Sequence, residues 1–266
     1  MTRVAIAGYG AVGRELVRRI ARGIDGVELV AIGARDHAKV ETDLRALGLD
    51  VAVDAIDALE PYADLVVEAA PAALLPTIAD PFLRAGKEVI VLSAGALLEH
   101  PHLLDLAAEH GGTLTVPSGA VLGLDAVGAC AESEISSVRM TTRKPVAGLI
   151  GAPALDDGVV IDNDLERPLR VFSGTAREAV RGFPANLNVA VALALAGIGP
   201  DRTEVEIWAD PTVTRNTHTI VVQSEVADLT MTIENVPSEN PRTGRITALS
   251  VIRLLRKRGA TLRVGS

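Results

Sequence analysis

Short apolar runs alternate with stretches of helical periodicity along the first 120 residues. The apolar runs predict strands at 3–7, 27–32, 51–53, 65–69, 88–92 and 113–116. The periodic stretches predict helices at 12–22, 40–47, 72–85 and 101–110. Strands that are apolar throughout and separated by helices are typical of a parallel sheet covered on both faces. Residues 1–119 are therefore predicted to form an α/β domain, a doubly wound parallel sheet of the Rossmann type.

The pattern changes after residue 120. Strands with a period of two are predicted at 135–142, 170–173, 204–209, 219–225 and 229–234, helices at 175–181 and 188–196, and a long loop at 149–168. This order predicts a second, α+β domain over 120–244 with antiparallel strands, which we expect to bind substrate and to form a dimer contact. The segment 245–266 returns to a helical period over 245–258, and we expect it to pack near the first domain.

A glycine motif, Gly8-Tyr9-Gly10-Ala11-Val12-Gly13, lies between the first strand and the first helix. Gly8 permits a tight turn, Gly10 lets the backbone approach a diphosphate, and Gly13 lets the helix pack closely on the strand. Backbone N–H groups at the helix start, those of Ala11 and Val12 among them, favour an anion. A glycine turn without a ligand is the alternative, but this context favours a dinucleotide. We therefore expect NAD or NADP here.

The end of the second strand should contact the ribose of the dinucleotide, about 20 residues beyond the motif. It carries Arg35 and Asp36. Arg35 is suited to a 2′-phosphate, whereas an acid would accept hydrogen bonds from ribose hydroxyls. These opposed signals predict that both cofactors are used. Asp36 could equally be the N-cap of the next helix.

Composition and charge exclude several classes of protein. Aromatic residues make up only 2% of the chain and the net charge is −8, so neither stacking platforms nor a basic surface favours a nucleic acid partner. With a single cysteine, Cys130, no intramolecular disulfide can form, and no HxxxH or CxxC spacing predicts a metal site. No apolar stretch reaches the ~18 residues of a membrane span, and the chain opens directly into a strand. We expect a cytoplasmic protein without a membrane partner.

Several uncommon motifs follow one another in a fixed order. They are Ser93–Leu97, Pro117–Ala120, Gly123–Asp125, Thr142–Pro145, Gly174–Ala179, Phe183–Ala190, Ala209–Pro211, Arg215–His218 and Glu234–Ser238. Through them the chain resembles the L-aspartate dehydrogenases over nearly its whole length. The resemblance implies NAD(P)-dependent oxidative deamination of L-aspartate to iminoaspartate, which hydrolyses to oxaloacetate and ammonia or feeds NAD synthesis. Thr243-Gly244 departs from the more usual Thr-Ser, so we assign no hydroxyl role there.

The resemblance also implies roles for individual residues. His218 corresponds to the catalytic histidine, and Ala120 and either Asn188 or Asn186, with Asn188 favoured, correspond to cofactor contacts. Imidazole suits the role because it exchanges protons near neutral pH. From its position alone, where a turn enters a strand, His218 could also be a surface or strand-capping histidine.

A dicarboxylate substrate needs a fixed cation, and Arg143 and Lys144 end an alternating strand. Lysine stands at only four positions in the chain, which suggests a chemical reason for it at 144. A salt-bridged strand end is the alternative. Ser118, Asn186 and Asn216 could hydrogen-bond the substrate, although turn or capping roles are as plausible for each of them.

Two other functions stay open at this point. The enzyme class could be right and the substrate different, of the homoserine or dihydrodipicolinate type, because a fold does not fix a substrate. Alternatively, the chain could be a dinucleotide-binding sensor without turnover, although such a protein should have lost His218 or the basic pair. We expect a homodimer, since the antiparallel half exposes a sheet face that a second subunit can cover.

Overall fold

The computed structural model describes residues 1–150, 161, 164–183, 187–237 and 244–265. The chain divides into two compact units. The first comprises Met1–Gly119 and Thr247–Val264, and the second comprises Ala120–Ile246 and Gly265–Ser266. Each is described by itself below.

The first unit is built on a six-stranded sheet in which every recorded pair of neighbouring strands is parallel, in the order β3-β2-β1-β4-β5-β6. Its strands are β1 (Thr2–Ala7), β2 (Val27–Gly33), β3 (Ala52–Asp54), β4 (Leu65–Glu68), β5 (Glu88–Val91) and β6 (Thr113–Thr115). This order confirms the predicted doubly wound α/β sheet. The direction of winding reverses between β1 and β4, and ligands of such sheets bind outside the carboxyl ends of the strands at this point.

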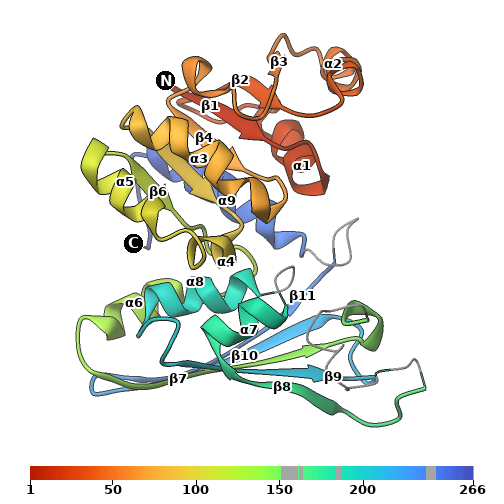
Figure 1. Cartoon of the computed structure of the whole chain (residues 1–266), viewed down its shortest axis with the longest axis vertical. Helices are drawn as coiled ribbons and strands as arrows, with labels where there is room; N and C mark the ends of the chain where they lie inside the picture. Colours follow the sequence, from red (N-terminus) through yellow and green to blue (C-terminus); the bar gives the residue numbers. More distant parts are fainter. Residues whose placement is uncertain (151–160, 162–163, 184–186, 238–243, 266) are drawn as a thin grey trace. The chain divides into compact units, whose positions relative to one another are not determined.

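Helices cover both faces of this sheet (Figure 1). They are α1 (Ala11–Ile20), α2 (His37–Ala46), α3 (Leu75–Arg84), α4 (Ala94–Leu97), α5 (His102–His110) and α9 (Ile246–Gly259) with the 3-10 turns Glu60–Tyr62 and Ala72–Leu74. Ala5 and Ala7 of β1 face α3 and α5, whereas Val4 and Ile6 face α1, α2 and α9. Because neighbouring residues of β1 are buried on opposite faces, the four residues from Val4 to Ala7 are all apolar.

The C-terminal helix α9 belongs to the core of the first unit. Its Val251 and Leu255 are fully buried in the same cluster as Leu16 and Val17 of α1. The chain thus returns to the first unit after Ala120–Ile246, which form nearly all of the second unit.

The second unit contains a five-stranded sheet in the order β11-β10-β7-β9-β8. Its strands are β7 (Ile135–Lys144), β8 (Leu169–Thr175), β9 (Thr203–Ala209), β10 (Asn216–Ser224) and β11 (Asp228–Asn235). The pattern predicted antiparallel strands, but β7 and β9 pair in parallel and the sheet is mixed. The physical reason is the long connection between β7 and β9, which includes β8 and two helices and so brings the chain back in the same direction.

Three helices, α6 (Leu124–Ala131), α7 (Ala176–Gly182) and α8 (Asn188–Ala196), cover one face of this sheet (Figure 1). We call this the inner face. The pattern did not predict α6, because its small residues give little contrast between a polar and an apolar side. Of the loop predicted at 149–168, residues 151–160 and 162–163 lie outside the described residues, and a 3-10 turn at Val146–Gly148 precedes it.

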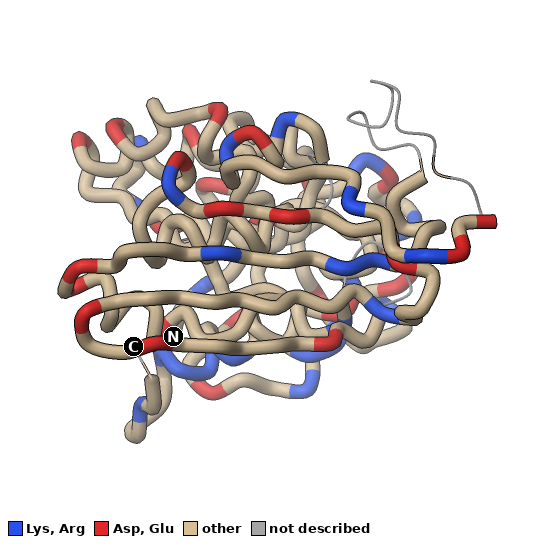
Figure 2. The backbone as a smooth tube through the Cα atoms, turned by 90° about the horizontal axis from the view of Figure 1, so that it is seen from below, with Lys and Arg blue, Asp and Glu red and all other residues tan. Residues whose placement is uncertain are grey.

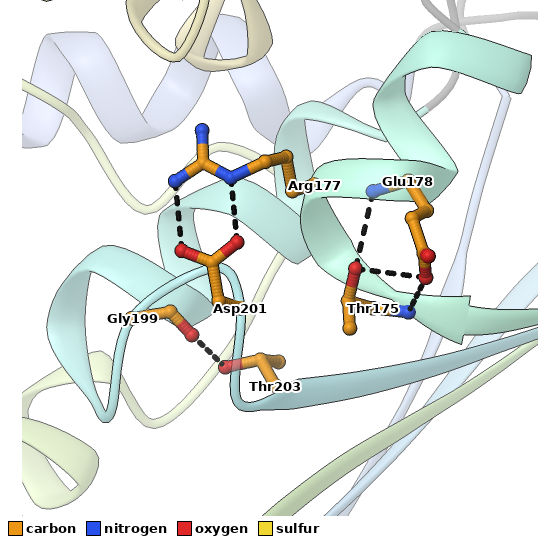
Figure 3. Close-up of polar contacts among 6 residues, drawn as sticks. All are labelled: Thr175, Arg177, Glu178, Gly199, Asp201 and Thr203. Carbon is orange, nitrogen blue, oxygen red and sulfur yellow. Dashed lines mark hydrogen bonds and ion pairs between the residues drawn. The ribbon is translucent and has the colours of Figure 1, made fainter.

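One of the motifs noted above explains the start of α7 (Figure 3). The side chain of Thr175 accepts a hydrogen bond from the Glu178 backbone N–H at 3.2 Å, and Glu178 accepts from the Thr175 N–H at 2.8 Å. This reciprocal capping box satisfies two of the free N–H groups at the helix start. Arg177 forms a bidentate ion pair with Asp201, so the helix is tied to the turn before β9. The motif therefore has a structural role.

Candidate functional site

Two positions of the glycine motif between β1 and α1 have no room for a side chain. Gly8 has φ of +111°, and a Cβ there would lie 2.4 Å from the carbonyl oxygen of Ala69. A Cβ on Gly13 would lie 2.1 Å from the carbonyl oxygen of Gly8, so the helix packs directly on the turn. Gly8 and Gly13 therefore hold β1, α1 and the residues after β4 in close contact.

Gly10 has the opposite surroundings, because a Cβ built on it would meet no atom within 4 Å. Gly10 is the N-cap of α1, no side chain caps this helix, and its first turn contains no acid. The free N–H groups that begin with Ala11 and Val12 thus carry the positive end of the helix dipole beside open space. This combination fits a diphosphate.

After β2, the sequence offered an arginine for a 2′-phosphate and an acid for ribose hydroxyls, and the structure leaves only the arginine available. Asp36 caps α2, with its Oδ1 accepting from the Lys39 N–H at 3.1 Å, so the alternative role foreseen for it is the one observed. Asp54, at the end of neighbouring β3, accepts hydrogen bonds from Ala55 and Tyr62. Arg35 is exposed and forms no ion pair with any described residue. The cation is therefore available, and both nearby acids are occupied.

A buried carboxylate that the sequence analysis missed ends β4. Glu68 is 0% exposed and accepts hydrogen bonds from residues after β4 and after β5. Burial raises the pKa of this carboxyl, and hydrogen bonds from Ser93, Ala70 and Leu92 act in the opposite direction. The sequence feature that could have revealed it is a single acidic residue at the end of an apolar strand, followed by small residues.

In the second unit, several buried polar side chains lie on the inner face of the sheet, beside its apolar residues. Met140, Thr142 and Lys144 alternate along β7 with the same orientation, and His218 lies opposite Thr142 on β10. His218 is 3% exposed and Lys144 is 2% exposed. The structure thus brings together His218 and Lys144, two of the predicted site residues.

The imidazole of His218 is fixed by Thr142, whose Oγ1 lies 3.1 Å from Nδ1 in a shared hydrogen bond. Burial, and secondarily the charge of Lys144, lower the pKa of His218 to about 3. The ring is consequently neutral at physiological pH. A neutral imidazole with one nitrogen held can accept a proton at the other.

Lys144 ends β7 as a buried cation without a counter-ion among the described residues. Burial lowers the pKa of its ammonium group to about 8. An isolated buried charge is costly, and an anion that reaches it relieves this cost. Lys144 is therefore a candidate for holding a carboxylate.

Arg143, predicted together with Lys144, lies on the other face of the sheet. Its guanidinium pairs with Asp210 at 2.9 Å and lies 5.0 Å from the centre of the Trp208 ring. The hydrogen bonds from Arg143 and Thr212 lower the pKa of Asp210 against the effect of burial. The salt-bridged strand end, the alternative foreseen for this pair, describes Arg143, and the structure does not place it with His218.

Two asparagines frame the same end of the inner face. Asn216 precedes His218 by two residues, so both have the same orientation on β10, and Asn216 pairs with Asn235 of β11. Asn235 is 5% exposed, and its Nδ2 donates to the carbonyl oxygen of Ala120 at 3.2 Å. Asn235, which the sequence analysis did not single out for a role, thus fixes the backbone of Ala120, a predicted cofactor contact.

The other predicted residues are spread over both units. Ser118 is exposed and belongs to the first unit, Asn188 begins α8 in the second, and Asn186 lies outside the described residues. In the described part of the chain, no group of three or more His, Cys, Asp or Glu side chains is arranged to hold a metal ion. None of the helices within the described ranges has the length and apolarity needed to cross a membrane.

Two protein families match the chain. The family described as "Aspartate dehydrogenase, C-terminal" matches residues 125–258, and the family described as "Homoserine dehydrogenase, NAD binding domain" matches residues 8–117. The first match includes Lys144 and His218, and the second begins at Gly8 of the glycine turn.

Individual proteins give a consistent result. An L-aspartate dehydrogenase 3 from Bordetella bronchiseptica is 55% identical over 99% of this chain and 97% of its own length. An L-aspartate dehydrogenase from Bradyrhizobium diazoefficiens is 53% identical over 99% of this chain and 94% of its own. A solved aspartate dehydrogenase from Thermotoga maritima covers 100% of both chains with a TM-score of 0.78 at 23% identity, which supports the fold.

Proposed function

The chain belongs to the aspartate dehydrogenase family, and from this premise we propose that it oxidises L-aspartate with NAD(P), with Lys144 holding a substrate carboxylate and His218 exchanging protons. The overall reaction takes a hydride from Cα and yields iminoaspartate, which water converts to oxaloacetate and ammonia. The proposal rests above all on one observation. A buried cation without a described counter-ion lies beside a buried neutral imidazole on the inner face of the second sheet.

The first unit supplies the cofactor site. Gly8, Gly10, Ala11, Val12 and Gly13 would hold the diphosphate, and the bound cofactor would accept the hydride. Arg35, which is exposed and forms no ion pair with a described residue, supports the use of NADP as well as NAD, because a guanidinium pairs well with a 2′-phosphate. Ala120 and Asn188 would provide further cofactor contacts from the second unit.

His218 would act as the proton acceptor from the substrate amine. When its Nδ1 donates to Thr142 Oγ1, Nε2 keeps a lone pair for the proton. The same nitrogen can then return the proton during hydrolysis of the imine.

Substrate binding would make this base stronger. Burial is the main cause of the lowered pKa of His218, and the positive charge of Lys144 lowers it further, so a carboxylate placed against Lys144 would offset only this second contribution and raise the pKa in part. The base would therefore gain strength when the anionic substrate is in place. Asn216, which shares the orientation of His218, and Ser118 would add hydrogen bonds to the substrate.

The test is replacement of His218 by alanine. We expect kcat/KM for L-aspartate to fall at least ~100-fold, because one positioned base contributes about that much, while NAD(P)+ still binds. Reduction of the nicotinamide is followed by absorbance and cofactor binding by calorimetry. The control is His110→Ala, an exposed histidine at the end of α5, which should keep full activity. Full activity of His218→Ala would overturn the proposed role.

The substrate itself is tested by comparing kcat/KM for L-aspartate, homoserine and L-glutamate. The buried ammonium of Lys144 favours a substrate with a side-chain carboxylate of the right length, so aspartate should be preferred over both. Preference for homoserine would support the alternative substrate type.

We also propose a homodimer in which a second copy covers the outer face of the second sheet. Figure 2 shows the strands of this sheet with no helix in front of them, and the positive positions on β7 lie beside negative positions on β9. Arg139 pairs with Glu204 across these two strands. Sedimentation velocity tests the state. We place the enzyme in the cytoplasm, where aspartate and NAD(P) are available, with its product entering NAD biosynthesis or aspartate metabolism.

A further inference from the structure

Glu68 lies where the winding of the first sheet reverses. It ends β4, pairs with Ala7 at the end of β1, and pairs with Val91 at the end of β5. Its carboxylate is therefore at the carboxyl edge of the sheet, at the point where doubly wound sheets bind their ligands. A fully buried acid at such a position requires compensation for its charge.

Hydrogen bonds from two loops provide that compensation. Oε2 accepts from the backbone N–H groups of Leu92 at 3.0 Å and Ser93 at 2.8 Å. Oε1 accepts from the Ala70 N–H at 3.3 Å and from the Ser93 hydroxyl at 3.0 Å. Three of these four donors are backbone groups that can only donate, so the arrangement is built for a carboxylate. Glu68 thereby joins the loop after β4 to the loop after β5.

The loop after β4 is in turn one wall of the glycine turn. A Cβ on Gly8 would lie 2.4 Å from the oxygen of Ala69 and 2.9 Å from the nitrogen of Ala70. The Ala69–Ala70 peptide thus packs against Gly8 without a gap, and the Ala69 N–H donates to Ala7. A displacement of Ala70 would be passed directly to the turn.

We propose that Glu68 is a positioning residue for the dinucleotide, acting through the Ala69–Ala70 peptide to keep the glycine turn in its binding shape. It does not contact the cofactor in this proposal. The inference rests on the proposed cofactor site at Gly8–Gly13. It predicts that changes at Glu68 act on cofactor affinity rather than on the chemical step.

A glutamine at position 68 would distinguish the hydrogen bond to the loop after β4 from those to the loop after β5. Its amide has one acceptor oxygen and one donor NH2 group. If the NH2 group faced Leu92 and Ser93, two buried N–H donors would lose their acceptor, so it should turn toward the Ser93 hydroxyl, which can accept, and toward Ala70. Glu68→Gln therefore keeps the hydrogen bonds after β5 and removes the one that holds Ala70.

The experiment measures binding and local opening in the full-length enzyme. We expect Glu68→Gln to weaken the calorimetric Kd for NAD+ roughly tenfold, which corresponds to about 1.4 kcal/mol, and to speed hydrogen exchange at the Ala70 amide. With saturating cofactor, kcat should stay within about twofold of wild type. Ser93→Ala removes a single donor and should weaken Kd two- to threefold, which keeps the test usable if Glu68→Gln does not fold.

The matched control is Glu88→Gln, a partly buried carboxylate at the start of β5, on the opposite edge of the same sheet, which accepts from Thr115 and pairs with Arg258. It should lower stability without changing Kd. Wild-type affinity in both Glu68→Gln and Ser93→Ala, or an equal loss in Glu88→Gln, would overturn the positioning role. Absence of NAD+ binding in the wild type would instead overturn the proposed cofactor site.

Discussion

Glu68 in the first unit and Lys144 in the second are both buried charges near the ends of their strands, but their surroundings are opposite. Glu68 in the first unit receives four hydrogen bonds, whereas Lys144 in the second has no counter-ion among the described residues. A fully compensated charge holds the backbone around it in one shape. A charge without compensation raises the free energy of the empty protein and favours whatever anion arrives. The contrast supports the two roles proposed above, backbone positioning for Glu68 and recognition of a substrate carboxylate for Lys144.

The strongest test of this contrast is Lys144→Met, which keeps an unbranched side chain of similar length and removes its charge. We expect KM for L-aspartate to rise roughly 10- to 100-fold, because a charge-assisted hydrogen bond is worth about 1.5–3 kcal/mol. Steady-state kinetics at saturating NAD(P)+ measures the change. Arg143→Gln is the matched variant, since it alters the neighbouring residue on the outer face and should leave KM within about twofold. A rise in KM with Arg143→Gln alone would reverse the assignment.

Lys144→Met should also stabilise the protein. The folded pKa of about 8 is below the ordinary value of 10.5, so the folded state is penalised while the group is charged, by on the order of 3 kcal/mol. In the wild type this penalty is complete below pH 8 and disappears as pH rises from 8 to 10.5. Denaturant unfolding at pH 7 should therefore show the variant to be more stable, and a loss of stability would contradict an uncompensated charge.

A smaller effect is the pH dependence of inhibition by succinate, which tests the charge of Lys144 in binding without the chemical step. Succinate has two carboxylates and no amine, so above neutral pH the pH dependence of its inhibition constant should come from Lys144. We expect this constant to be flat from neutral pH to about pH 8 and to rise by up to tenfold per pH unit above it, as Lys144 loses its proton. The Lys144→Met enzyme should show weak inhibition without this dependence. A flat profile in the wild type would remove Lys144 from the site.

The smallest expected effect involves a third kind of charge, Arg35, which is exposed and has no ion-pair partner in the described part of the chain. Because solvent screens this group, Arg35→Ala should raise KM for NADP+ only about 5- to 10-fold and leave that for NAD+ within about twofold. Steady-state kinetics with each cofactor measures the ratio. An equal change for both cofactors would exclude contact with the 2′-phosphate.

Much of the first unit could be predicted because a parallel sheet buries whole strands, which leaves an unmistakable apolar pattern. The site in the second unit could be predicted only in part. His218 and Lys144 come close because their strands, β10 and β7, are neighbours in the sheet. Tertiary packing decides which strands are neighbours, and the sequence pattern does not reveal it.

The orientation of Lys144 was nevertheless present in the sequence. Val138 and Met140 have the parity of Lys144, so they indicated that Lys144 faces inward and Arg143 outward. The compensation of Glu68 was not predictable, because three of its four donors are backbone groups that no side-chain pattern reveals.

The outer face of the second sheet carries the chain's single tryptophan. Trp208 lies between Arg143 and Arg170, with its ring centre 5.0 and 5.9 Å from the two guanidinium carbons. Its intrinsic fluorescence therefore comes from one known place, remote in sequence from the glycine turn. If the proposed homodimer covers that face, the emission wavelength should shift to the red when dilution separates the subunits and exposes Trp208 to more water.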